Sequence, residues 1–153
     1  MEVKQMDFSS VYLERCDKET ENLLSEEGQA FLKNPISYLR TNKNEFIYIE
    51  SMHFNDIGID ALSIEIDDVF GKYDVMLGLK LPKKKEAAIQ TYLSQQLKGN
   101  DEISFDLMFD QNDGLWNVNF TFDYLEGFSE EMTFQEAFSL IYTFLSDLVE
   151  EAK

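Results

Sequence analysis

The sequence has little of what cross-links a chain, holds a metal or cradles a phosphate. One cysteine, Cys16, among 153 residues excludes a disulfide within the chain, so nothing requires an oxidising compartment. One histidine, His53, and no CxxC or HExxH pattern exclude the common thiolate and histidine metal sites. The phosphate-binding patterns GxxxxGKS/T and GxGxxG are absent as well. We therefore expect no cofactor and no bound metal.

Long apolar runs, targeting signals and linkers are also missing. No apolar run approaches the roughly 18 residues of a membrane span. Residues 1–10 lack a basic segment followed by an apolar one, so no secretory signal is visible. Internal repeats and Pro/Gly/Ser-rich linkers are absent, and 44% hydrophobic residues suffice for a core. We predict a cytoplasmic protein with one domain over residues 1–153.

Basic residues are scarce relative to acidic ones. The chain has 13 Lys and Arg against 30 Asp and Glu, a net charge of −17. This charge repels nucleic acid and anionic lipids, so we expect neither as a partner. It attracts a protein with a basic surface and speeds the encounter with it. Solubility alone is the alternative explanation.

The first part of the chain predicts a helical region over about residues 11–41. Leu23, Leu24, Phe31 and other apolar residues up to Leu39 recur at near-helical spacing, and Asn34-Pro35 is typical of a helix start. Whether residues 11–13 begin this region or form a separate strand is left open by the pattern.

The period changes at residue 45, and residues 45–152 predict the sheet and its helices. Residues 46–49 form a continuous apolar run, typical of a strand covered on both faces. Apolar residues then alternate with others over 62–66 and 73–81, which predicts two further antiparallel strands joined by loops near Gly58 and Gly71. Pro82 opens a helix that Lys98-Gly99 close.

A hairpin over residues 103–124 is the clearest local signal. Two alternating runs flank Asp113-Gly114, a two-residue turn that accepts positive φ at both positions. That turn pairs residues whose numbers sum to 227, and it places apolar residues opposite one another on one face. The predicted pairs are Phe109–Val118, Leu107–Phe120, Phe105–Phe122 and Ile103–Tyr124.

A last helix starts at Thr133, where Glu136 completes a capping box. Its expected buried stripe is Phe134, Phe138, Ile141, Leu145 and Leu148, widened by Ala137 and Phe144. The element order is then α-βββ-α-ββ-α. We predict an α+β fold with a five-stranded, largely antiparallel sheet, one face covered by helices and the other partly exposed and acidic.

Catalytic machinery is not recognisable. Cys16 and His53 share no local motif, and acidic neighbours should raise the pKa of the Cys16 thiol. Asp67-Asp68 and residues 110–113 carry carboxylates that Mg²⁺ or Ca²⁺ could use, but without the spacing of a known loop. We predict that the protein is not an enzyme. A carboxylate-based enzyme is the remaining catalytic alternative.

The hairpin carries one family resemblance. Glu102-Ile-Ser-Phe-Asp106, Asn112-Asp-Gly114 and the strand from Trp116 that ends in Phe-Asp-Tyr124 resemble the strand-turn-strand of YezG-like immunity proteins. This resemblance implies a cytoplasmic antitoxin that neutralises a secreted bacterial nuclease toxin. In size, charge and element order the chain is also similar to type III secretion chaperones, which implies a homodimer that holds an extended client segment.

Both functions need an acidic surface and a protein partner with a basic one, either a toxin or a secreted client. An immunity or inhibitor protein would act by occluding the basic cleft of a toxin. We predict that the partner contacts the exposed side of the hairpin and its neighbours, through the carboxylates of Asp106, Asp110, Asp123, Glu126, Glu65 and Asp67.

Overall fold

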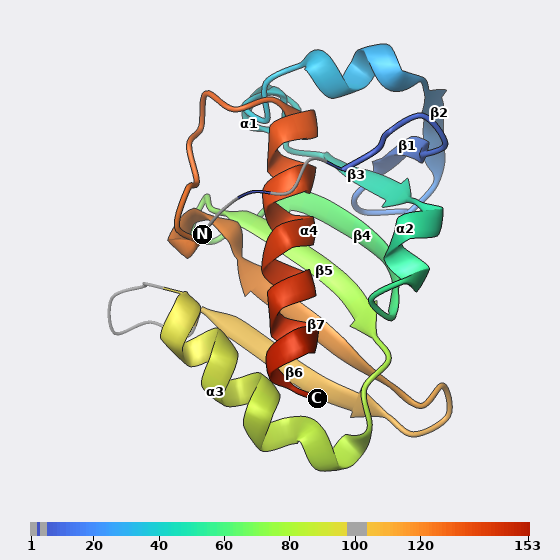
Figure 1. Cartoon of the computed structure of the whole chain (residues 1–153). Coiled ribbons are helices and arrows are strands. Elements are labelled where there is room, and N and C mark those ends of the chain that lie inside the picture. The colour runs from blue at the N-terminus through green and yellow to red at the C-terminus, as the bar shows by residue number, and fades with distance from the viewer. Residues whose placement is uncertain (1–2, 4–5, 98–103) are drawn as a thin grey trace.

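The computed structural model describes residues 3, 6–97 and 104–153 as one α+β domain. Seven antiparallel strands form a single sheet in the order β2-β1-β3-β4-β5-β7-β6 (Figure 1). The strands are β1 (Tyr12–Asp17), β2 (Leu23–Glu27), β3 (Glu45–Glu50), β4 (Ile59–Ile66), β5 (Tyr73–Leu79), β6 (Phe105–Asp110) and β7 (Leu115–Thr121).

The prediction of five strands is wrong because the N-terminal region contributes two more. Instead of a helical region over residues 11–41, β1 pairs with β3 along its whole length, and β2 adds to the outer side of β1. Helical structure in this region is limited to the 3₁₀ turn η1 (Gln29–Lys33) and the short helix α1 (Tyr38–Thr41). Pairing between segments distant in sequence decided the outcome here, and apolar spacing does not reveal such pairing.

The strands β3, β4 and β5 lie where the alternating pattern predicted them, with one correction. Ile47 and Ile49 of β3 are buried, but Phe46 and Tyr48 are only half-buried, so this strand is covered on one face and not on both. The short helix α2 (Met52–Asn55) follows β3 and contains His53.

The hairpin of β6 and β7 forms with a register that differs from the predicted one. Phe109 lies opposite Trp116 and Phe105 opposite Phe120, so paired numbers sum to 225 and not to 227. A shift of two residues keeps the apolar side chains on the same face. The cause is a four-residue connection, in which the amide of Gly114 donates to the carbonyl of Asp110 at 2.8 Å.

The predicted hairpin was also too long. The residues 122–124 form the 3₁₀ turn η3 (Phe122–Tyr124) instead of continuing β7. The predicted pairs Phe105–Phe122 and Ile103–Tyr124 are therefore wrong for Phe122 and Tyr124, while Ile103, Lys98 and Gly99 lie outside the described residues.

Helices cover one face of the sheet. Helix α4 (Phe134–Glu151) crosses it, and the turn η2 (Lys83–Lys85) and helix α3 (Glu86–Gln96) lie beside it on the same side (Figure 1). The capping box at Thr133 and Glu136 forms as predicted, and every residue of the predicted stripe is buried. Ring contacts such as Phe120–Phe144, 5.2 Å between centroids, join sheet to helix.

Candidate functional site

The face of the sheet turned away from α4 carries no helix of the part of the chain that the structure describes. We call it the open face and define it by one transverse row of side chains, one from each strand, that alternates with the buried residues. Cross-strand pairing places these residues side by side in the order Glu26, Glu14, Tyr48, Ser63, Met76, Asn119 and Asp106. Carboxylates thus stand at both ends of the row and uncharged side chains in the middle.

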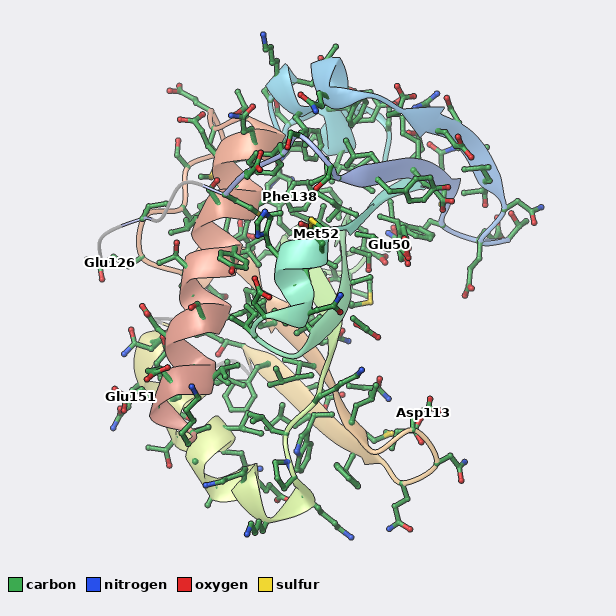
Figure 2. The ribbon with its side chains drawn as sticks, turned by 45° about the vertical axis from the view of Figure 1, so that its right-hand side comes forward. Glu50, Met52, Asp113, Glu126, Phe138 and Glu151 are labelled. Atoms are coloured by element: carbon green, nitrogen blue, oxygen red, sulfur yellow. The ribbon has the colours of Figure 1, made fainter. Side chains whose placement is uncertain are left out.

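Tyrosine hydroxyls hold the carboxylates at the β1 end of the open face. Tyr48 donates to Glu50 at 2.7 Å, and Tyr12 donates to Glu14. Figure 2 shows Glu50 projecting away from α4. Both contacts join residues i and i+2, which lie on the same side of a strand. These hydrogen bonds fix the positions of the Glu14 and Glu50 carboxylates on the open face.

Two adjoining hollows occupy the middle of the open face and its rim. The first, about 420 Å³, lies between Tyr48 and Met108. The second, about 390 Å³, reaches from Tyr12 to the exposed Met52. Asp60 lines both hollows, and no lysine, arginine or histidine among the described residues lines either of them.

An irregularity in β4 shapes the first hollow. The pairing of β4 with β5 shifts between Ile59 and Leu62, and Asp60 there accepts the amide of Gly78 at 2.8 Å. A Cβ atom at Gly78 would lie 2.5 Å from the Asp60 carboxylate, so a larger residue here would require that carboxylate to move. Small residues at 61, 63 and 78 keep the floor low between the larger side chains around it.

The end of the open face near the β4–β5 turn concentrates negative charge. Glu65 and Asp74 are directly opposite one another, and Lys18 lies 3.4 Å from Glu65 and 2.9 Å from Asp68. Burial, together with the charges of Asp67 and Glu65, raises the pKa of Asp74 to about 6. Burial raises the pKa of Glu65 as well, and Lys18 opposes that rise. Like charges facing one another across strands destabilise a sheet, so this arrangement is costly for the fold.

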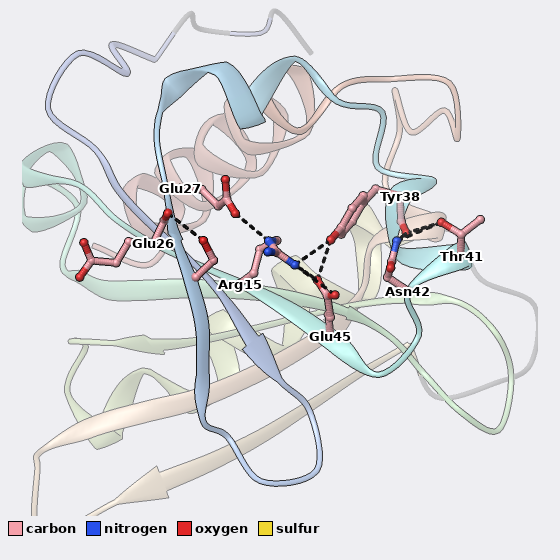
Figure 3. Close-up of polar contacts among 8 residues, drawn as sticks. Arg15, Glu26, Glu27, Tyr38, Thr41, Asn42 and Glu45 are labelled. Carbon is pink, nitrogen blue, oxygen red and sulfur yellow. Dashed lines mark hydrogen bonds and ion pairs between the residues drawn. The ribbon is translucent and has the colours of Figure 1, made fainter.

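A second polar cluster lies on the other side of the sheet (Figure 3). The Arg15 guanidinium contacts Glu27 at 2.7 Å and Glu45 at 3.2 Å, and the Tyr38 hydroxyl donates to Glu45 at 2.8 Å. Glu45 is only 7% exposed. Arg15 neutralises the charge of this carboxylate, and both Arg15 and Tyr38 donate hydrogen bonds to it. The cluster thus joins β1, β2 and β3 to α1, which is a structural role.

The structure separates the six residues predicted to contact a partner. Asp106 and Glu65 lie on the open face. Asp110 accepts the amide of Asn112 at 2.9 Å in the hairpin connection, and Asp67 accepts the amide of Phe70 at 2.9 Å in the β4–β5 turn. These two carboxylates thus stabilise turns at the ends of the face.

The remaining two predicted residues lie elsewhere. Asp123 belongs to η3 and not to a strand, and its half-buried carboxylate accepts the amide of Tyr73 at 2.7 Å. Burial raises its pKa, and the hydrogen bond from Tyr73 opposes that rise. Glu126 lies beside α4, away from the open face (Figure 2). Neither residue therefore belongs to the two hairpin strands, and contact with a partner stays a prediction for both.

Residues of β1 and β3 belong to the open face and were missed. Tyr12 and Glu14 were missed because β1 was not predicted as a strand. Tyr48 and Glu50 were missed because residues 46–49 were interpreted as covered on both faces. Tyr48 carried a signal that this side of β3 is not fully covered, since a tyrosine hydroxyl usually reaches water or a polar partner.

The cysteine and the histidine are in different surroundings. Cys16 is buried in β1, and burial followed by the neighbouring Glu14 raises the pKa of its thiol to about 11, in the predicted direction. His53 lies 3.8 Å from both Asp7 and Asp56. Within residues 3, 6–97 and 104–153, no group of three or more His, Cys, Asp and Glu side chains is arranged to hold a metal ion.

Comparison with known proteins adds no relative. No family model, curated protein or solved structure matches the chain. The resemblance to YezG-like immunity proteins therefore stays a prediction. As to membranes, none of the helices described here has the length and apolar character needed to cross one.

Proposed function

We propose that the protein is a cytoplasmic, non-enzymatic binding protein that neutralises a toxin by covering its basic cleft with the open face. The toxin class that we propose is a nuclease, in line with the resemblance of the hairpin. One observation carries the proposal: within the described part of the chain, one face of the seven-stranded sheet has no helix on it, and that face ends in carboxylates on both sides.

Physical complementarity supports this function. A nuclease holds its substrate through Lys and Arg side chains directed at phosphates, so its cleft is basic. Carboxylates at Glu26, Glu14 and Asp106 would meet those cations in place of phosphates. The large negative charge of the chain would speed the encounter, and the flat open face would then exclude the substrate by occupying the cleft.

The cost of the acidic face to the fold also supports a binding function. Glu65 and Asp74 face one another across two strands, and the raised pKa of Asp74 reports that its charge is disfavoured there. A surface serving solubility alone gains nothing from placing two acidic residues directly opposite one another on neighbouring strands. Residues that weaken the fold are concentrated at functional sites in many proteins.

The experiment compares charge reversals on and off the open face. The test variant is E26K/D106K, which reverses an exposed carboxylate at each end of the row. Its control is E131K/E151K, which changes the net charge equally at exposed positions outside the row. Each variant and the wild type would be immobilised to capture proteins from the native host, and the captured partner would then be purified.

We expect E26K/D106K to associate with that partner about tenfold more slowly at low salt and with a flatter salt dependence. The control should stay within about twofold of the wild type. Inhibition of the partner's nuclease activity by the wild type completes the test. Equal binding by the two variants would remove the open face from the interface, and an obligate dimer holding an extended client would favour a secretion chaperone.

A further inference from the structure

The two hollows of the open face combine methionines with carboxylates. Met76 and Met108 line the first hollow and Met52 lines the second. Met108 and Met52 are 64% and 63% exposed, which is unusual for large apolar side chains in this chain. The thioether is flexible and polarisable, so methionines adapt to apolar side chains of varied shape.

The charges around the methionines are of one sign. Asp106 and Asp60 line the first hollow, and Glu50 and Asp60 line the second, without a cation among the lining residues. Asp60 keeps its place through the amides of Gly78 and Ala61 at 2.8 and 2.6 Å. A ligand that fits must therefore present apolar groups to the methionines and positive charge to the carboxylates.

The width of the first hollow sets the size of that ligand. It extends from Tyr48 on β3 to Asp106 and Met108 on β6, which stand four strand spacings apart. At 4.8 Å per spacing this distance is about 19 Å. A single side chain cannot bridge it, whereas a helical segment of about 13 residues can.

We propose that the two hollows bind a basic amphipathic segment of a partner protein, with its apolar side chains on Met76, Met108 and Met52 and its Lys or Arg side chains on Asp106, Asp60 and Glu50. This inference rests on the proposed function, since it specifies which part of a basic partner the open face takes. A second copy of the chain does not fit, because it would bring carboxylates against carboxylates.

The experiment uses the whole protein and synthetic peptides of about 18 residues, five helical turns. The first peptide places Leu and Lys so that a helix has one apolar and one basic face. The second has the same composition in a permuted order without an apolar face. In the third, Glu replaces Lys. Binding is followed by the NMR signals of the methionine methyl groups, with Met132 beside α4 as the internal reference.

We expect the amphipathic peptide to saturate and to shift the methyl signals of Met76 and Met108 but not of Met132. The permuted peptide should bind about tenfold more weakly, and the acidic peptide should not bind. M108Q should weaken binding of the amphipathic peptide several-fold, which is a smaller loss than at an interface hot spot. Its control, V69Q, removes a 78% exposed apolar side chain outside both hollows and should have no effect.

Equal binding of the amphipathic and permuted peptides, without methyl shifts at Met76 and Met108, would overturn the inference. That result would mean that general charge attraction alone explains peptide binding. It would leave the proposed function standing if E26K/D106K still slowed association with the captured partner. An equal loss of affinity for the amphipathic peptide in M108Q and V69Q would also overturn the inference, because the hollows would then have no special part in binding.

Discussion

Replacing Asp74 by asparagine tests whether the open face weakens the fold. Burial and the charges of Asp67 and Glu65 raise the pKa of Asp74 from 3.8 to about 6. A shift of this size corresponds to about 3 kcal/mol at 1.36 kcal/mol per pKa unit. Because Asp74 is only half-buried, solvent screens part of the effect, and we expect D74N to stabilise the protein by about 1 kcal/mol at neutral pH.

The pH dependence of this gain has a definite sign. Between the unfolded pKa of 3.8 and the folded value of about 6, the folded protein binds more protons at Asp74 than the unfolded chain. The stability of the wild type therefore falls as pH rises through this window, and D74N lacks that part of the loss. The advantage of D74N should be largest near pH 7 and shrink as pH falls from 6 toward 4.

Urea unfolding of the wild type and D74N at about pH 5 and about pH 7.5 measures this difference, since contributions from other groups are common to both proteins. D106N is the matched control, because it makes the same substitution at an exposed position of the same face. It should stay within about 0.5 kcal/mol of the wild type. Destabilisation by D74N at pH 7.5, or a gain independent of pH, would refute the reasoning.

Two further predictions concern residues that stabilise the sheet. R15M should destabilise the protein by about 2–3 kcal/mol in urea unfolding, because it leaves the buried Glu45 carboxylate without its cation; a loss below about 0.5 kcal/mol would contradict a structural role. G78A should lower the free energy of unfolding by about 1–2 kcal/mol, because its Cβ displaces the Asp60 carboxylate that accepts the Gly78 amide. An unchanged melting temperature for G78A would show that Asp60 moves at no cost.

Local sequence patterns predicted the strands and the helix start that depend on neighbouring residues. The alternation over residues 62–66 and 73–81 predicted β4 and β5, and the Thr133–Glu136 capping box predicted the start of α4. The N-terminal region failed for a physical reason. Leu23 and Leu24 are 51% and 46% exposed on an edge strand, so their spacing reflects no buried helical stripe. β1 is a strand through its pairing with β3, some 30 residues away.

For the candidate site too, the prediction succeeded for residues placed by their own strand and failed where distant segments meet. Asp106 and Glu65 were placed on the exposed face by the alternation of their own strands. Asp123 was misplaced because β7 ends at Thr121, and its carboxylate accepts the amide of Tyr73, which is 50 residues away in the sequence. The β1 half of the open face could not be predicted without the strand itself, and the hollow depends on the β4 irregularity at Asp60.

Photo-crosslinking from two positions tests most directly whether the open face binds the partner. A photoreactive residue at Asn119, in the row between Met76 and Asp106, is compared with one at Gln135, exposed on α4. Mixed with the captured basic partner, the protein labelled at Asn119 should form a covalent product and the one labelled at Gln135 should not. Crosslinking from Gln135 with none from Asn119 would contradict the account.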